Sequence, residues 1–298
     1  MVTQGNKEFG PEHGVINLSK LGFRYFRIFL RVSPATKRKL YQELPLHPNV
    51  GWLFSCTGWF NFAMGIFAKN NSEINDLSTV IRKLLTEEDT IIYQSELTYL
   101  VSFGNLENQN SEMVIIDSKD QEFNSKPVEI DFLKLYTIDS SMSDDEYAKI
   151  LGISEQEFTE IQKNLVNNNI ILGTQKRLNY KGKYCKVFVD TSAINERQLE
   201  KFIQELHIDK NCLFYERANG KYDLGFEIVL KNKEVLTEKY LKIFKQYKVA
   251  ILKENLYTNL FPQSKVSNIK EIKDVFLQQK DSMNYDLTNS KFWYLNYL

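Results

Sequence analysis

Two distant stretches of this chain repeat one pattern of a glycine followed by alternating polar and apolar residues. The first, "TGWFNFAMGIFAKN", begins at Thr57, and the second, "NGKYDLGFEIVLKN", begins at Asn219. When Gly58 is aligned with Gly220, similar residues stay in register at a constant separation of 162 positions. A fold for this chain therefore has to contain the same structural unit twice.

The sequences around the two glycines predict the same order of elements. Aromatic and β-branched runs predict strands, and apolar residues three or four positions apart predict helices. The first copy reads strand 23–32, helix 35–44, strand 49–58, strand 60–68, helix 72–85 and strand 90–103. The second copy repeats this order, from a strand at 183–191 to a strand at 249–261. The order βαββαβ predicts a ferredoxin-like unit with both helices on one face of a four-stranded antiparallel sheet.

The other face of each sheet is left open and carries apolar residues. These include Trp52 and Phe54 in the first copy and Leu213 and Tyr215 in the second. An exposed apolar face of this size has to be covered. We therefore expect the two units to pair sheet to sheet, within the chain or between chains.

The bulk composition limits the class of protein. A chain of 298 residues with 43% hydrophobic content can form two or three domains. Lys+Arg and Asp+Glu both total 38, so binding to nucleic acid or to a membrane has to come from local charge asymmetry. Cys56, Cys185 and Cys212 form no CxxC pair, which favours buried free thiols in a reducing compartment. With a polar start and no long apolar run, we expect a cytoplasmic protein without a membrane segment.

Between the two copies, the sequence predicts a winged helix-turn-helix. Ser143 with Glu146, and Ser154 with Glu157, form capping boxes that each start an amphipathic helix, with Gly152 in the turn between them. A preceding helix at 130–138 completes a three-helix unit, and residues 170–187 supply a wing.

The expected organisation follows from these elements. It comprises an N-terminal segment (1–21), a first βαββαβ unit (22–104), a linker with one strand (105–127), the winged helix-turn-helix (128–182), a second βαββαβ unit (183–262) and a helical and aromatic tail (263–298). The tail ends in "SKFWYLNYL", and we expect so apolar an end to dock on this chain or on a partner.

A winged helix followed by a βαββαβ domain whose second hairpin carries G-x-[YF]-[DN]-[LF] resembles the Lrp/AsnC family of feast/famine transcription regulators. The resemblance covers about 128–261, and "HPNVGWLFSCTGWFNFAMGIFA" extends it to the first copy. The chain is similar to a double-length member that lacks its first helix-turn-helix. The resemblance implies a DNA-binding regulator that responds to a small effector such as an amino acid and assembles as a homo-oligomer or with related regulators. The competing interpretation is an effector-sensing adaptor that does not bind DNA.

The resemblance places the helix that starts at Ser154 in the major groove. It assigns base contacts to Gln156, Thr159 and Lys163 of that helix. The same helix carries three glutamates near its start, which repel phosphates although they also stabilise the helix dipole.

The wing offers cations in place of those glutamates. Its basic residues are Lys176, Arg177, Lys181, Lys183 and Lys186. We expect the first four to contact DNA phosphates if this module binds DNA, whereas an exposed strand pair also carries lysine for solubility alone.

A second basic run lies at the start of the first unit. It consists of Lys20, Arg24, Arg27, Arg31, Lys37, Arg38 and Lys39, and it is interleaved with aromatic residues. We expect the cations to lie on the solvated side of a strand whose aromatic residues point into the core. The alternative is a nucleic-acid-binding face.

The glycine hairpins are the candidate effector sites that the resemblance implies. The matching positions are Gly58 with Asn61 and Gly220 with Asp223. Glycine allows close approach of the backbone, and a carboxylate could hold an α-ammonium group. The alternative is that the two glycines only shape turns.

Some relatives of this fold act as sirohaem decarboxylases, so catalysis has to be weighed. Such chemistry calls for histidine and arginine around an acidic macrocycle, whereas His13, His47 and His207 lie in a polar terminus or at helix ends. The sequence has no phosphate loop, nucleophile elbow or HExxH motif near them. We therefore expect that the chain is not an enzyme and that it uses no metal and no cofactor.

Overall fold

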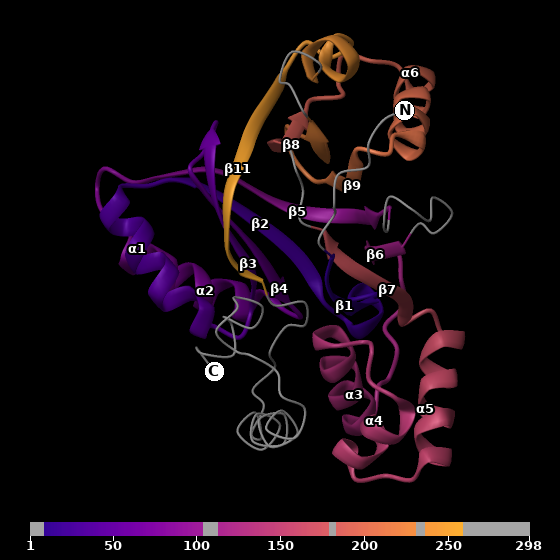
Figure 1. Ribbon diagram of the computed structural model, residues 1–298. Helices are drawn as coiled ribbons and strands as arrows, with labels where there is room; N and C mark the ends of the chain where they lie inside the picture. The colour runs from indigo at the N-terminus through magenta and orange to yellow at the C-terminus, as the bar shows by residue number, and fades with distance from the viewer. Residues whose placement is uncertain (1–8, 104–112, 179–182, 231–235, 259–298) are drawn as a thin grey trace.

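The computed structural model describes residues 9–103, 113–178, 183–230 and 236–258, and it has the expected α+β fold (Figure 1). The tail at 263–298 lies outside the described residues. The first unit consists of β2 (Arg24–Arg31), α1 (Pro34–Glu43), β3 (Val50–Gly58), β4 (Phe62–Ala68), α2 (Asn71–Leu84) and β5 (Thr90–Ser102). Short 3-10 turns, η1 (Ser19–Leu21) and η2 (Leu44–Leu46), precede β2 and β3. Ser33 and Asn70 cap α1 and α2, because each side chain accepts a hydrogen bond from a backbone N–H of the first turn.

The second unit repeats this order with a shorter second helix. It consists of β8 (Lys183–Val189), α6 (Glu196–Ile208), β9 (Cys212–Ala218), β10 (Leu224–Leu230), η3 (Thr237–Leu241) and β11 (Tyr247–Thr258). The sequence predicted a regular helix at 236–247, whereas η3 is a single turn of π-helix. Leu236, just before this turn, and Tyr240 and Leu241 within it are buried against the second unit.

The two units close into one barrel. Within the described residues, eight antiparallel strands form a ring in the order β2-β4-β3-β11-β8-β10-β9-β5, and β5 pairs back with β2. The units meet at two seams, β3 with β11 and β5 with β9. The sheets therefore pair within the chain, and they do so edge to edge, which turns their helix-free faces toward each other inside the ring.

Strand β2 shows why this closure is stable. Alternate side chains of a strand point to opposite faces. Phe26, Ile28 and Leu30 pack under the helices α1 and α2, whereas Tyr25 and Phe29 lie on the opposite, inner face. Both faces of this strand are buried, and the ring leaves neither unit with an apolar face in water.

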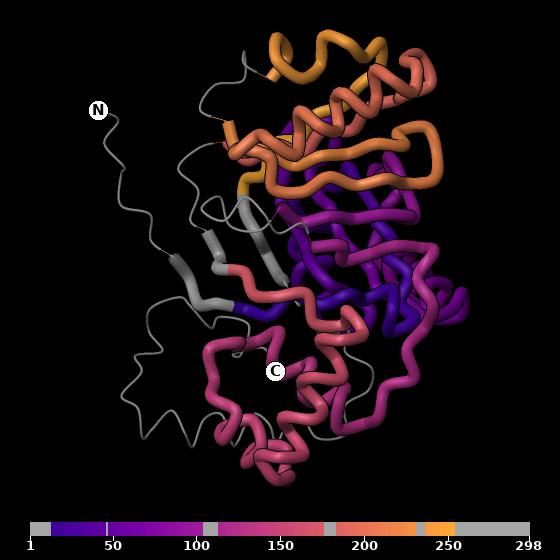
Figure 2. Tube along the Cα trace, turned by 90° about the vertical axis from the view of Figure 1, so that its right-hand side faces the viewer, coloured from indigo at the N-terminus to yellow at the C-terminus, as the bar shows by residue number. Residues whose placement is uncertain are grey.

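The winged-helix unit lies at one end of the barrel. It contains α3 (Pro127–Ile138), α4 (Asp144–Leu151), α5 (Glu155–Asn167) and β7 (Ile171–Leu178). Figure 2, turned by 90°, shows these magenta segments below the strands, with the orange helices of the second unit above. Ser143 and Ser154 cap α4 and α5, as expected, and Glu146 completes the predicted capping box of α4. The linker between the first unit and α3 contributes β6 (Met113–Asp117), which pairs with β5.

The partner of the wing strand differs from our expectation. In the described residues, β7 pairs with β1 (Phe9–Ile16) and not with β8, which belongs to the barrel. His13 lies opposite Gln175, and these residues are 162 positions apart. The strand that precedes the first unit therefore pairs with the strand that precedes the second. The N-terminal segment thus supplies the strand on which the wing is built.

One apolar core joins the winged helix to the barrel. Phe132 and Phe158 of the helices belong to the same cluster as Tyr25 and Phe67 of the barrel, so the two parts are packed as one body. Cys56, Cys185 and Cys212 are buried, as expected. In the part of the chain that the structure describes, no helix is long and apolar enough to span a membrane.

Candidate functional site in the barrel interior

Two cations lie at equivalent positions inside the barrel. Arg27 on β2 is fully buried, and Lys186 on β8 is 5% exposed. Both occur in the pattern Tyr-x-cation-x-Phe, which is present at Tyr25–Phe29 and again at Tyr184–Phe188, 159 positions later. Our expectation that Arg27 faces solvent is wrong, and so is the assignment of Lys186 to a basic wing. Each cation shares the inner face of its strand with the flanking aromatic residues, because side chains two positions apart point the same way.

Two acids from the second unit hold these cations. Glu216 on β9 accepts a hydrogen bond from Arg27 Nη1, and its other oxygen lies 3.5 Å from Lys186 Nζ. Glu227 on β10 forms an ion pair with Lys186 and accepts a hydrogen bond from the Tyr184 hydroxyl. Gly225 makes room for Glu216, because a Cβ at that position would lie 2.2 Å from Glu216 Oε1. One carboxylate therefore bridges the cations of the two units.

The other two nitrogens of the Arg27 guanidinium group differ in their hydrogen bonds. Its Nη2 donates to Ser95 Oγ at 3.2 Å, whereas its Nε is buried without a hydrogen-bond partner. A buried donor without a partner costs about 1–3 kcal/mol. The guanidinium group therefore retains one unused donor in the centre of the barrel.

Aromatic rings surround the charged cluster. The Arg27 guanidinium lies 5.5 Å from the Phe29 ring centre and 5.3 Å from that of Phe188. Lys186 Nζ lies 5.7 Å from the Trp52 ring centre. Trp52 Nε1 donates a hydrogen bond to the Tyr25 hydroxyl. These rings pack against one another and enclose the paired charges in apolar surroundings.

Burial shifts the proton affinities of the cluster. It lowers the pKa of Lys186 to about 8 and that of Arg27 to about 10, because the charged forms lose hydration. Burial raises the pKa of the Cys56 thiol to about 12. Burial also acts to raise the pKa of Glu227, but Lys186 and the Tyr184 hydroxyl outweigh it and hold that pKa below its ordinary value. Lys186 is therefore the member of this cluster whose proton is most easily exchanged near neutral pH.

The two glycine hairpins meet at one end of the barrel. Trp59, beside Gly58, has its ring centre 5.0 Å from that of Tyr222, beside Gly220, and Tyr93 completes the contact. Both glycines have a positive φ, 120° and 116°, which other residues rarely adopt. The turns thus pack the rings of Trp59, Tyr93 and Tyr222 in one cluster with Phe29 and Phe188.

Asn61 and Asp223, the other two candidate effector residues, have matching structural roles. The Asn61 amide accepts from Val32 N at 2.9 Å and donates to Val32 O at 2.7 Å. Asp223 accepts from Thr191 N at 3.0 Å and from the Thr191 hydroxyl. Each side chain fastens the loop that leaves the first strand of its unit. The four candidate effector residues are therefore brought together at one end of the barrel, with both polar side chains already hydrogen-bonded.

The candidate DNA-binding residues lie apart from this cluster. Gln156 and Lys163 are exposed on α5, and the half-buried Thr159 hydroxyl donates to Glu155 O at 2.8 Å. Lys176 and Arg177 lie on β7, and the exposed Lys183 begins β8. Lys181 lies outside the described residues.

The histidines lie on other elements than the charged cluster. His13 is in β1, His47 follows η2, and His207 on α6 packs against Phe103 and Tyr215. Among the described residues, no group of three or more His, Cys, Asp or Glu side chains is placed to hold a metal ion.

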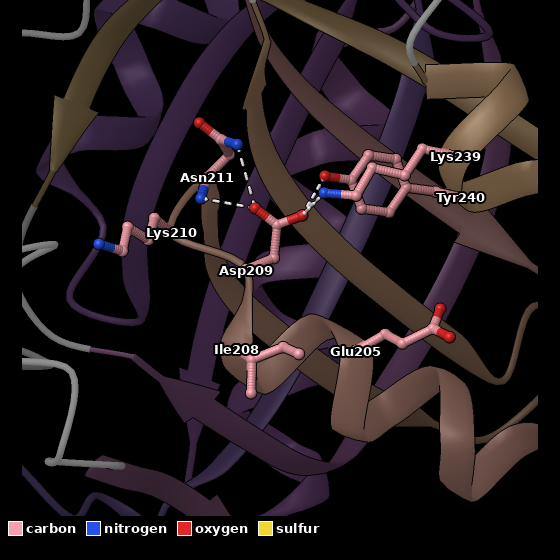
Figure 3. A pocket seen from close by; sticks show the side chains of 7 residues that line it. All are labelled: Glu205, Ile208, Asp209, Lys210, Asn211, Lys239 and Tyr240. Carbon is pink, nitrogen blue, oxygen red and sulfur yellow. Dashed lines mark hydrogen bonds and ion pairs between the residues drawn. The ribbon is translucent and has the colours of Figure 1, made fainter.

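A surface pocket of about 430 Å³ lies in the second unit (Figure 3). It is lined by Glu205, Ile208, Asp209, Lys210, Asn211, Lys239 and Tyr240. Asp209 accepts hydrogen bonds from Lys239, from the Tyr240 hydroxyl and, at 2.9 Å, from Asn211 N. Burial acts to raise the pKa of Asp209, but these donors hold it below its ordinary value. Since both carboxylate oxygens are engaged, we assign this group a structural role, fastening the α6–β9 loop to η3.

In the described residues, two βαββαβ units close into one barrel, with a winged helix between them. A solved structure with a similar fold is siroheme decarboxylase NirDL. It matches with a TM-score of 0.61 and 13% identity, over 92% of this chain and 84% of that chain. The same values hold for NirDL in co-complex with an iron-uroporphyrin III analogue.

Other solved structures match a smaller part of this chain. Bacillus subtilis LrpC covers 44% of this chain and 96% of its own, with a TM-score of 0.37 and 19% identity. No protein-family model matches the sequence, and no curated protein does.

The likeness to NirDL contradicts our expectation that the chain is not an enzyme. The solved structure that shares nearly the whole architecture is an enzyme. That expectation rested on the positions of three histidines. It overlooked Arg27 and Lys186, which appear in the sequence as ordinary surface cations.

Proposed function

We propose that this protein is an enzyme that decarboxylates a polycarboxylated substrate of the porphyrin type, with its site in the barrel interior. The observation that carries this proposal is the position of Glu216, whose carboxylate lies between Arg27 of one unit and Lys186 of the other. A substrate carboxylate that enters beside Glu216 meets the same two cations, and Arg27 Nε offers a further donor. The likeness to NirDL supports the choice of substrate class.

The proposed reaction needs neither an oxidant nor a reductant. The bond between the carboxylate carbon and its neighbour breaks, the electron pair stays on the neighbouring carbon, CO2 leaves, and that carbon takes up one proton. A buried site favours this step because the negative charge leaves the strongly hydrated carboxylate oxygens and moves to the neighbouring carbon, where the proton then neutralises it. Arg27 fixes the orientation of the carboxylate, and the rings of Trp52 and Phe188 pack against the flat body of the substrate.

Incubation of the full chain with siroheme under anaerobic conditions tests this function. Mass spectrometry of the tetrapyrrole should show the loss of CO2. The variant Arg27→Gln should be slower by roughly 100-fold, because it loses the charge-assisted hydrogen bond. The matched control is Arg24→Gln, on the same strand but paired with Glu96 at the surface, which should retain the wild-type rate. An unchanged tetrapyrrole after incubation with folded wild-type protein contradicts the proposal.

DNA binding through the winged helix is the second candidate function. The observation in its favour is that α5 leaves Gln156 and Lys163 exposed, while Lys176, Arg177 and Lys183 belong to the adjoining strands. A salt-dependent gel shift on genomic fragments tests it. Alanine at Lys176, Arg177, Lys181 and Lys183 should weaken binding to every sequence and flatten the salt slope by roughly one unit per lost contact. Alanine at Gln156 and Thr159 should change sequence preference instead.

A small effector, such as an amino acid, belongs to the same second candidate. We propose the turns at Gly58 with Asn61 and Gly220 with Asp223 as its site. Calorimetric titration with the standard amino acids tests this. Binding that survives Asn61→Ala and Asp223→Ala places the effector elsewhere.

A further inference from the structure

We propose that Lys186 delivers the proton that replaces CO2 on the substrate carbon, and that Glu227 and Tyr184 position it for that transfer. This inference rests on the proposed decarboxylation and adds the source of the proton. The proton has to bind the same carbon that loses the carboxylate. The donor therefore has to lie next to the carboxylate-binding position. Lys186 fulfils this condition, since its Nζ is 3.5 Å from Glu216 Oε2.

The other proton carriers of the barrel are less suitable. Arg27 holds its proton more tightly, with a pKa of about 10, and the pKa of the Cys56 thiol is raised to about 12. Burial also raises the pKa of Tyr25, whose hydroxyl accepts from Trp52 Nε1. The pKa of Lys186, about 8, is the closest to neutrality in this set. A general acid works best when its pKa lies near the working pH.

The surroundings of Lys186 connect it to a chain of hydrogen bonds. Tyr184 donates to Glu227, and Glu227 holds the Lys186 ammonium group, so both residues fix the direction of Nζ. The titratable groups that face Lys186 are Glu227 on β10, Glu216 on β9, Arg27 on β2, Cys56 on β3 and Tyr184 on its own strand. Burial and Arg27 lower its pKa, whereas Glu227 and Cys56 raise it.

The experiment follows CO2 release from siroheme against pH. In the wild type the rate should fall as pH rises through about 8, because the protonated lysine is the donor. Below pH 8, Lys186→Met should reduce the rate by roughly 100-fold to 10,000-fold, while the affinity for siroheme changes by less than roughly tenfold. Above pH 8 the difference from the wild type should shrink, because the wild-type lysine loses its proton there. Glu227→Gln removes an acid that raises the pKa of Lys186, so the rate should begin to fall at a lower pH than in the wild type. Lys201→Met, at an exposed lysine of α6, is the control and should leave the profile unchanged.

A second readout does not depend on activity. Nuclear magnetic resonance of lysine-labelled protein should show one lysine that titrates near pH 8, and Lys186→Arg should remove that signal. The inference is overturned if the wild type releases CO2 and folded Lys186→Met keeps the wild-type rate. It is also overturned if Glu227→Gln changes neither the pH at which the rate falls nor the pH at which the lysine signal titrates. If the wild type binds siroheme without releasing CO2, the decarboxylase function fails, and the assignment of a proton donor fails with it.

Discussion

The two βαββαβ units share one strand order but present different inner faces to the barrel. Each supplies a tyrosine, a cation and a phenylalanine at the same positions of its first strand. The second unit adds Glu216 and Glu227, where the first unit has Phe54 and Gly65 at positions 162 residues earlier. The duplicated fold thus places the two cations at matching positions. The difference at the other two positions makes the inner face of the second unit acidic and that of the first unit apolar. A ligand that enters this barrel meets two chemically distinct walls.

The largest expected effect comes from removing the cation of the first unit. Arg27→Met should lower the free energy of unfolding by about 3–5 kcal/mol, because it leaves Glu216 buried with one weaker partner. Urea denaturation measures this. Arg24→Met is the matched control, since its ion pair with Glu96 is partly exposed and should contribute less than about 1 kcal/mol. Equal effects of the two substitutions would show that Arg27 is not buried in an ion pair.

The two glycine turns should respond unequally. Gly58→Ala should cost about 3 kcal/mol and Gly220→Ala about 1–2 kcal/mol, although both have a positive φ. A Cβ at Gly58 meets the backbone oxygen of Val249 at 2.6 Å, whereas at Gly220 it meets the Tyr93 hydroxyl at 2.9 Å, and a side chain can move. Thermal unfolding of both variants measures the difference. The reverse order would contradict the close backbone contact of Gly58 with Val249 across the β3–β11 seam.

Asn61 and Asp223, which fasten the loop after the first strand of each unit, should contribute similarly to the free energy of unfolding. Asn61→Ala and Asp223→Ala each remove two hydrogen bonds to the loop after the first strand, so each should destabilise the fold by about 1–2 kcal/mol. Denaturation of the two variants side by side checks this. Wild-type stability together with weaker binding of an amino acid in either variant would favour the effector interpretation of these residues.

The smallest expected effect concerns acid stability of the first unit. Burial acts to raise the pKa of Asp89, but hydrogen bonds from Thr36, Thr86 and Ser33 hold it at about 2. A carboxyl whose pKa is lower in the folded state contributes stability above its unfolded value, 3.8, and loses it as pH falls through about 2. Asp89→Asn should therefore cost less than about 1 kcal/mol at neutral pH, because solvent screens this group, and progressively less as pH falls through about 2. A cost that does not change with pH would contradict this sign.

Local signals in the sequence were sufficient for the order of elements. The serine caps of α4 and α5 and the glycine hairpins depend on neighbours a few residues away, so their patterns could be interpreted directly. The closure of the barrel and the pairing of β1 with β7 join residues more than 100 positions apart, and no local pattern specifies such pairs.

The candidate site was missed for a related reason. Arginine and lysine are almost always exposed unless paired, so Arg27 and Lys186 were expected in solvent. Their partner, Glu216, lies 189 positions from Arg27, too far for the sequence to indicate the pair. A signal was nevertheless present, because Tyr-x-cation-x-Phe occurs at Tyr25 and again at Tyr184. Comparison of the two first strands, and not of the hairpins alone, would have found it.

The affinity of Arg27→Gln for iron-uroporphyrin III is the most direct test of the central claim, which is that the two buried cations hold a substrate carboxylate. We expect this variant to bind roughly 10-fold to 100-fold more weakly than the wild type in an absorbance titration, because it loses a charge-assisted hydrogen bond. Arg24→Gln, on the same strand, should bind like the wild type. Equal affinities for the wild type and Arg27→Gln, with both proteins folded, would contradict a carboxylate site inside the barrel.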